Sequence, residues 1–218
     1  MGWVMGGWVM GGWMMGVLLL LVGYLLGSLP TGYLAGRWLK GIDLRALGSG
    51  STGATNVLRH LGTKAAVAVF LIDALKGSLA VYLPVAAGME SVAWWRVGMG
   101  LMAVVGHSRS CWLGWKGGKS VATSLGVLVS LSWATALSCF GVWAVLVGIT
   151  RWVSLGSVAA AVTAPFWMLL WQQPLSSVLF AVVAGVYVFL SHWRNLQRLL
   201  AGTEPKLGHK QPTPESTP

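Results

Sequence analysis

The chain has 218 residues, of which 56% are hydrophobic and only 9% are charged. Soluble domains carry about a quarter charged residues and disordered chains are poor in apolar ones, so this composition argues against both classes. The 15 Lys and Arg against 5 Asp and Glu give a net charge of +10. In a soluble protein this excess would suggest binding to nucleic acid, but in so apolar a chain the cations instead indicate which loops lie on the cytoplasmic side of a membrane. The two cysteines, Cys111 and Cys139, have no metal-type spacing, so no metal site is expected.

The N-terminal segment repeats Trp, Gly and Met, with Trp at positions 3, 8 and 13. No Lys or Arg precedes Arg37, so the segment lacks the basic region of a secretory signal peptide. Tryptophan prefers the membrane interface. We therefore interpret residues 1–13 as a segment that anchors the chain at the outer face of a membrane.

Seven apolar segments follow. A membrane-spanning helix needs about 20 mostly apolar residues, and somewhat fewer where its neighbours shield it. The segments cover residues 14–38, 65–87, 91–106, 121–133, 134–149, 153–171 and 175–190. The fourth and fifth segments adjoin, and residues 132–136 barely interrupt the apolar run there. One continuous helix would reduce the count to six. The sequence predicts an all-α, polytopic integral membrane protein built as a seven-transmembrane-helix bundle.

The positions of the cations distinguish between these counts. With seven spans, 13 of the 15 Lys and Arg share one side, while Lys76 lies within the second segment and Arg96 lies near the opposite face. Cytoplasmic loops are enriched in Lys and Arg, so we expect the N-terminus outside and the C-terminus in the cytoplasm. Six spans would place Arg151 across the membrane from the basic loops. We expect residues 1–204 to form one transmembrane domain and the Pro-rich residues 205–218 to form a flexible cytoplasmic tail.

Three polar stretches interrupt the apolar pattern, and all are expected on the cytoplasmic side. They are residues 41–56 with Arg59 after them, residues 116–123, and residues 192–204. Glycine-rich stretches with hydroxyls and cations make good phosphate sites, because several backbone N–H groups can point into one concavity. The alternatives are a flexible connector for the first stretch and a simple turn flanked by Lys116 and Lys119 for the second.

Charged and ionisable residues elsewhere suggest structural roles. Asp73 and Lys76 lie three apart in an apolar helix, where charges are costly and usually paired, so we expect an ion pair, with shaping of the substrate site as the alternative. His192 and Asn195 are also three apart and are expected to face the same way, although a lone histidine at a helix end is most often solvated. Gly118-Lys119-Ser120 is not a Walker A loop, because the first glycine of that motif falls at Leu113.

In this order, the polar stretches resemble the PlsY family of membrane glycerol-3-phosphate acyltransferases, which use acyl phosphate as donor. The resemblance extends from about Gly27 to Gly208 and depends on the whole ordered set of short motifs. These motifs are Gly27-Ser-Leu-Pro30, Gly48-Ser-Gly, Gly53-Ala-Thr-Asn56 with Arg59, Asp73-Ala-Leu-Lys-Gly77, Gly106-His107, Lys116-Gly-Gly-Lys119, Val121-Ala-Thr123, and His192, Asn195, Arg198, Gly202, Glu204 and Lys206. Two positions depart from the family: Ser51 replaces its usual asparagine, and Ser120 replaces its usual glycine.

The resemblance implies transfer of a fatty acyl group from acyl phosphate to the sn-1 hydroxyl of glycerol 3-phosphate. The products are lysophosphatidic acid and phosphate, in the first step of phospholipid synthesis. No cofactor is implied. The implied partners are the two substrates, membrane lipids and, as a candidate, the soluble enzyme that makes acyl phosphate. The implied location is the bacterial inner or plasma membrane, with the active site on the cytoplasmic face.

The resemblance also assigns the candidate site residues. The candidate catalytic residues are Ser49, Arg59, Lys119, His192 and Asn195. The candidate substrate- and phosphate-binding residues are Gly48, Gly50, Ser51, Gly53, Thr55, Asn56, Lys116, Gly117, Gly118 and Glu204. The cations are expected to neutralise phosphate charge, His192 and Asn195 to orient glycerol 3-phosphate, and the donor phosphate to take the proton.

A small permease for an anionic solute is the alternative function from a different class. Its glycine loops would line a cytoplasmic gate. Transporter sites usually lie near the middle of the membrane, whereas these polar groups gather at one face, which favours the enzyme. A third reading is a non-enzymatic anchor for soluble lipid enzymes. An acyltransferase dyad of the H-x-x-x-x-D type is absent, since no histidine is followed five residues later by Asp.

Overall fold

The protein is described by a computed structural model that covers the backbone of residues 2–89 and 92–208 and, within those ranges, the side chains from residue 13 onward. These residues form α-helices and short 3-10 helices and contain no strand. The α-helices are α1 (Gly2–Ser28), α2 (Thr31–Lys40), α3 (Ala54–Leu61), α4 (Thr63–Ala86), α5 (Val92–Ser108), α6 (Val121–Leu131), α7 (Trp133–Thr150), α8 (Val153–Leu170), α9 (Leu175–Ser191) and α10 (Trp193–Leu200). The 3-10 helices are η1 (Leu44–Ala46) and η2 (Cys111–Leu113). The predicted all-helical class is confirmed for the described part of the chain.

Several helices have the length and hydropathy of membrane spans. Within the described residues, four segments qualify: Trp13–Lys40, Thr63–Ala86, Trp133–Thr150 and Val153–Leu170. A fifth qualifies if α9 and α10, which are bent by 56° relative to each other, count as one span. Helices α5 and α6 are shorter, with 17 and 11 residues. The number of membrane crossings and the side on which each end lies stay predictions.

Two helix breaks refine the expected segments. The first expected segment is interrupted at Leu29 and Pro30, because proline has no N–H to donate and disfavours the helical conformation of the residue before it. The second break lies at Ser132, whose backbone is extended and whose hydroxyl accepts a hydrogen bond from Thr135 N at 3.3 Å, which caps α7. Residues 121–149 therefore do not form one continuous helix.

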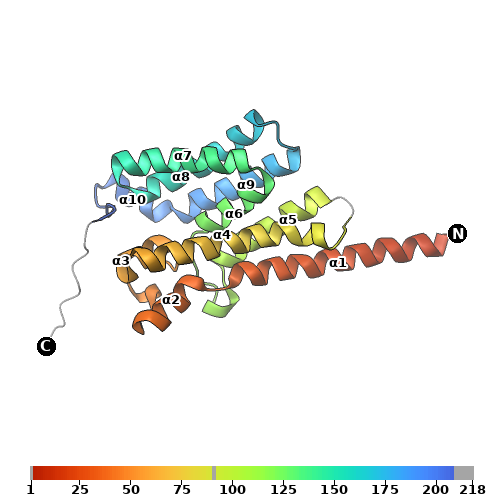
Figure 1. Cartoon of the computed structure of the whole chain (residues 1–218), viewed down its shortest axis with the longest axis horizontal. Coiled ribbons are helices and arrows are strands. Elements are labelled where there is room, and N and C mark those ends of the chain that lie inside the picture. Colours follow the sequence, from red (N-terminus) through yellow and green to blue (C-terminus); the bar gives the residue numbers. More distant parts are fainter. Residues whose placement is uncertain (1, 90–91, 209–218) are drawn as a thin grey trace.

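The long helices lie side by side along the length of the molecule (Figure 1). The short helices α2, α3 and α10 gather at one end, opposite the end where α1 begins (Figure 1). Helix α6 packs against both α4 and α7, and it approaches α4 backbone to backbone. A Cβ atom at Gly126 would lie 1.8 Å from Ala74 O, and one at Gly77 would lie 2.2 Å from Thr123 O. Glycine at these positions permits the close approach, as is common between membrane helices.

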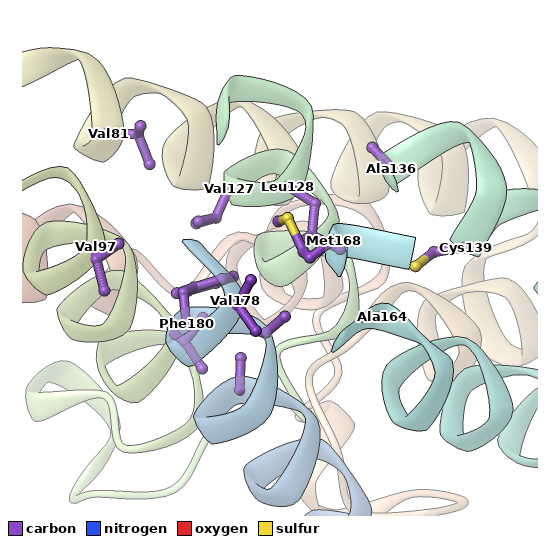
Figure 2. Close-up of a cluster of buried hydrophobic side chains, with 13 residues drawn as sticks. Val81, Val97, Val127, Leu128, Ala136, Cys139, Ala164, Met168, Val178 and Phe180 are labelled. Carbon is purple, nitrogen blue, oxygen red and sulfur yellow. The ribbon is translucent and has the colours of Figure 1, made fainter. Parts of the chain in front are cut away.

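The largest group of buried apolar side chains lies where α6, α8 and α9 meet (Figure 2). Leu128, Met168 and Phe180 are its largest members, and Cys139 and Ala136 join it from α7. Close packing of such side chains fixes the relative positions of these helices. This packing places the starts of α6 and α8 and the end of α9 next to one another.

Candidate active site

A cavity of about 420 Å³ opens at the end of the bundle where α3, α4, α6, α8 and α9 converge. Residues of all three polar stretches line it: Ser49, Ser51, Gly53, Thr55, Asn56 and Arg59 from the first, Lys119 from the second, and His192, Asn195 and Glu204 from the third. Its volume lies in the range of small-molecule sites. The structure therefore brings together stretches that are far apart in the sequence.

The loop of the first stretch is built around Asn56, which is buried at the start of α3. Its side-chain amide lies 2.9–3.0 Å from the carbonyl oxygens of Leu44, Leu47 and Ser51, and its Oδ1 accepts a hydrogen bond from Ser49 N at 3.4 Å. An amide side chain has two N–H bonds to donate, and the loop carbonyls engage both. Asn56 therefore holds the loop in shape at the wall of the cavity.

Glycine is required twice in this loop. Gly48 and Gly50 have φ angles of +57° and +67°, a left-handed backbone that glycine adopts without steric cost. Neither residue lines the cavity. The hydroxyl of Ser51 accepts a hydrogen bond from Gly53 N at 3.3 Å, a short turn of the kind that asparagine also forms.

The first turn of α3 faces the cavity through Gly53, Ala54 and Thr55. A helix N-terminus presents unpaired backbone N–H groups and a partial positive charge, so it attracts anions. Arg59 lies on the same helix and also lines the cavity. Burial lowers the pKa of Arg59 from its usual value, yet the guanidinium stays protonated at neutral pH. This end of the cavity is electropositive.

The second stretch packs against the end of α5. Gly118 N donates a hydrogen bond to His107 O at 3.1 Å, and a Cβ atom at Gly118 would lie 2.0 Å from His107 Nε2. A Cβ atom at Gly117 would lie 2.2 Å from His107 O. The two glycines thus serve this close approach, and Lys119 follows directly and enters the cavity.

Lys116 lies elsewhere, in a separate surface pocket with Gly50, Asp43 and Arg45. The two lysines of the Lys-Gly-Gly-Lys motif are therefore not neighbours in one site. Ser120 has a φ of +60°, and its hydroxyl donates to Val104 O at 2.6 Å. This left-handed backbone gives a physical reason why glycine suits that position.

A chain of polar contacts joins the second stretch to the third. Lys119 Nζ donates a hydrogen bond to Asn195 Oδ1, and Asn195 Nδ2 donates to Glu204 Oε1 at 2.7 Å. Arg198 Nε donates to the other carboxylate oxygen of Glu204 at 2.8 Å. Both ends of the Asn195 amide are thereby oriented, with its oxygen toward the cation and its N–H group toward the carboxylate.

Burial controls the charge of the two basic side chains at this point. It lowers the pKa of Lys119 to about 8, although the charge of Glu204 opposes this shift. Burial and the nearby Lys119 charge lower the pKa of His192 to about 4. His192 Nδ1 lies 2.8 Å from Val188 O, which can only accept, so Nδ1 carries the proton. The other ring nitrogen, Nε2, is then a free hydrogen-bond acceptor.

Asp73 and His107 also line the cavity, although site shaping was only the alternative interpretation for Asp73 and His107 was not among the candidate site residues. Lys76 Nζ lies 2.8 Å from Asp73 Oδ1, which confirms the predicted ion pair. Thr31 Oγ1 donates to the same oxygen at 2.5 Å, and His107 Nδ1 lies 3.5 Å from it. Two signals were available for Asp73, its charge in an apolar helix and the Asp73-Ala-Leu-Lys-Gly77 motif. Its link to His107 depends on how α4 and α5 pack.

The rest of the cavity is an apolar arm that runs from the polar end along α6. Its walls come from four helices: Val67 and Phe70 of α4, Leu125 and Leu128 of α6, Cys139, Phe140 and Trp143 of α7, and Ala160 and Ala161 of α8. The cavity therefore combines a cationic, hydroxyl-rich end with an apolar interior.

Comparison with known proteins identifies the family. A family model described as glycerol-3-phosphate acyltransferase matches residues 17–202. The chain belongs to this family. A glycerol-3-phosphate acyltransferase of Synechococcus sp. (strain JA-2-3B'a(2-13)) is 58% identical over 191 residues, which are 88% of this chain and 94% of the relative. One of Gloeobacter violaceus is 52% identical, over 85% of this chain and 91% of the relative.

Two solved structures have the same fold. Both are crystal structures of PlsY, described as an integral membrane glycerol 3-phosphate acyltransferase, in a glycerol 3-phosphate form and a lysophosphatidic acid form. They are 39% and 38% identical to this chain, with TM-scores of 0.83 and 0.80, and each match covers 89% of this chain and 96% of the solved chain. The resemblance to the PlsY family is confirmed, and the acyltransferase is a membrane enzyme of lipid synthesis.

Proposed function

We propose that this glycerol-3-phosphate acyltransferase takes acyl phosphate as its donor and acylates the sn-1 hydroxyl. The observation that carries the proposal is the single cavity with an electropositive end and an apolar arm. Acyl phosphate has the same two parts, a phosphate headgroup and an apolar tail. The products are lysophosphatidic acid and inorganic phosphate.

Two phosphate groups must be held near each other. The first turn of α3 supplies backbone N–H groups at Ala54 and Thr55, and Ser49 and Arg59 add a hydroxyl and a charge. Lys119 supplies the second cation, and its contact with Asn195 holds it in place. Other candidate positions shape the loops that carry these groups: Gly48, Gly50, Asn56, Gly117 and Gly118. Lys116 lies in the separate surface pocket, so we assign it no phosphate of the reaction.

The reaction joins the hydroxyl oxygen of glycerol 3-phosphate to the acyl carbonyl carbon. The bond from that carbon to the phosphate oxygen breaks, and phosphate leaves. The hydroxyl proton passes to the leaving phosphate, because burial lowers the pKa of His192 to about 4 and makes it a weak base. His192 Nε2 accepts a hydrogen bond from the hydroxyl and orients it. Arg59 and Lys119 stabilise the charge that develops on oxygen.

We also propose seven membrane crossings, with the N-terminus outside and the C-terminus in the cytoplasm, in the bacterial inner or plasma membrane. The proposal is supported by the 13 cations that share one side and by the gathering of α2, α3 and α10 at one end of the bundle (Figure 1). It places the polar end of the cavity at the cytoplasmic face. A soluble enzyme that makes acyl phosphate would deliver the donor there.

The decisive experiment supplies purified protein with radiolabelled glycerol 3-phosphate and, separately, with palmitoyl phosphate, acyl-CoA or acyl-ACP. We expect labelled lysophosphatidic acid only with palmitoyl phosphate. Product from acyl-CoA or acyl-ACP but not from palmitoyl phosphate overturns the donor assignment. Arg59→Ala is expected to lose most activity, with Arg194→Ala as the matched control at an exposed position. Near-normal turnover of Arg59→Ala removes Arg59 from the site.

A further inference from the structure

The apolar arm has one open side and one closed end. Val67 on α4 and Phe140 on α7 line it and are 50% and 43% exposed on the outer surface of the bundle. Both helices pack against α6, which lies between them. The arm is therefore accessible from the side that faces lipid in a membrane. An acyl chain can enter it laterally while its headgroup stays at the polar end.

The deep end of the arm is closed by side chains that belong to the packed core. Leu128 and Cys139 line the cavity, yet they are only 7% and 3% exposed. Both belong to the core cluster, together with Met168 and Ala136 (Figure 2). Leu128 lies seven residues after the start of α6 at Val121, or about 10 Å deeper along the helix. The arm is thus a pocket of finite depth.

We propose that Leu128 and Cys139 form the end wall of the acyl-chain pocket and set the length of acyl chain that the enzyme prefers. The inference builds on the proposed function, because the tail position follows from a phosphate headgroup bound at Arg59 and Lys119. The same cavity joins that cationic end to the arm, so the occupant of the arm is the tail of the donor. Each methylene group that the arm buries is expected to raise the affinity about four-fold until the wall is reached.

The test measures kcat/KM for a series of donors that differ only in the number of carbons in the acyl chain. Leu128→Ala removes three carbon atoms from the wall and makes room for about two methylene groups. For each variant we compare kcat/KM for a donor two carbons longer than the wild-type optimum with kcat/KM for that optimum. In Leu128→Ala we expect this ratio to rise about 16-fold, or four-fold for each of the two methylene groups. Cys139→Leu fills the same space from α7 and is expected to move the optimum to shorter chains.

The matched control is Leu131→Ala, on the same helix. Leu131 packs against the same core cluster but does not line the cavity, so its truncation weakens packing without lengthening the arm. The ratio of kcat/KM for the longer donor to kcat/KM for the wild-type optimum is compared in the two variants. If it rises no more in Leu128→Ala than in Leu131→Ala, the proposal is overturned. If Leu128→Ala has no activity, the affinities of alkyl phosphates of graded chain length are measured by calorimetry instead. An unchanged preference between longer and shorter alkyl phosphates in Leu128→Ala also overturns the proposal.

Failure of this proposal is distinguishable from failure of the donor assignment. The chain-length series is made in whichever donor class the wild-type enzyme uses, whether acyl phosphate, acyl-CoA or acyl-ACP. If the donor assignment is wrong, the series is made with another class of donor, and the comparison between variants still tests the end wall. If Leu128 and Cys139 do not form the end wall, the enzyme still uses the same donor class, but the variants do not change the preferred chain length.

Discussion

The ammonium group of Lys119 donates a hydrogen bond to the side-chain oxygen of Asn195, which lies 76 residues further along the chain. The contact joins the loop before α6 to the short helix α10, and Glu204 continues it through the other end of the amide. The position of the cation therefore depends on a neutral side chain and on a carboxylate behind it.

Replacing Asn195 with Ala is expected to lower kcat/KM for glycerol 3-phosphate by about 30-fold, corresponding to about 2 kcal/mol. The substitution leaves the Glu204 oxygen without its partner and frees Lys119 to move, and buried polar groups that lose a partner cost about this much. Steady-state kinetics measure the effect. Arg194→Ala, at the exposed neighbouring position, is the control and is expected to stay near wild type. Equal activity in both variants would contradict a positioning role for Asn195.

The value of kcat/KM is expected to fall as the pH rises through about 8. Burial lowers the pKa of Lys119 to about 8, so the side chain is a cation below this pH and loses its proton above it. The neutral amine no longer attracts phosphate, and kcat/KM reports ionisation of the free enzyme. The prediction is tested by a pH series between about 6 and 10.

Lys119→Arg separates this cause from others, because arginine keeps its charge throughout that range. We expect the variant to lose the decline above pH 8, whatever its activity at neutral pH. Asn195→Asp places a carboxylate beside Lys119 and is expected to move the decline to higher pH, since a nearby negative charge favours the protonated amine. An unchanged decline in Lys119→Arg would assign the titration to another group.

Gly118→Ala is expected to reduce activity strongly while leaving the helices folded. The added Cβ atom would lie 2.0 Å from His107 Nε2, so the loop must move, and Lys119 moves with it. Gly148→Ala on α7 is the matched control, because a Cβ atom there meets nothing within 4 Å. Activity and thermal unfolding in detergent are measured for both. Full activity of Gly118→Ala would show that the close contact with His107 does not position Lys119.

Asn56→Asp is expected to destabilise the loop of the first stretch by about 3 kcal/mol and to lower Tm. A carboxylate has no N–H to donate to the three loop carbonyls, and its charge would be buried beside their oxygens. Thermal unfolding and limited proteolysis of the loop measure this loss. Lys64→Gln changes the net charge by the same amount at an exposed residue and serves as the control. A Tm equal to that of the control would contradict the role of Asn56 in holding the loop.

Local features of this protein follow from its sequence alone. Long apolar runs require helices, because a backbone in an apolar environment must satisfy its own hydrogen bonds. The Asp73–Lys76 ion pair is equally local, since it follows from three-residue helical spacing. The break at Pro30 was not predicted within segment 14–38, although its cause, proline chemistry, is also local. The glycine-rich polar stretches could also be recognised as the parts that build a site.

The tertiary structure alone decided which members of those stretches meet. Lys116 and Lys119 are three residues apart, yet only Lys119 enters the cavity, because Gly117 and Gly118, which lie between them, pack closely on His107. The contact of Lys119 with Asn195 and the end wall at Leu128 likewise depend on how distant helices pack. Sequence spacing encodes the conformation of neighbours along the chain, whereas contacts between distant residues arise only when whole helices bury their side chains against one another.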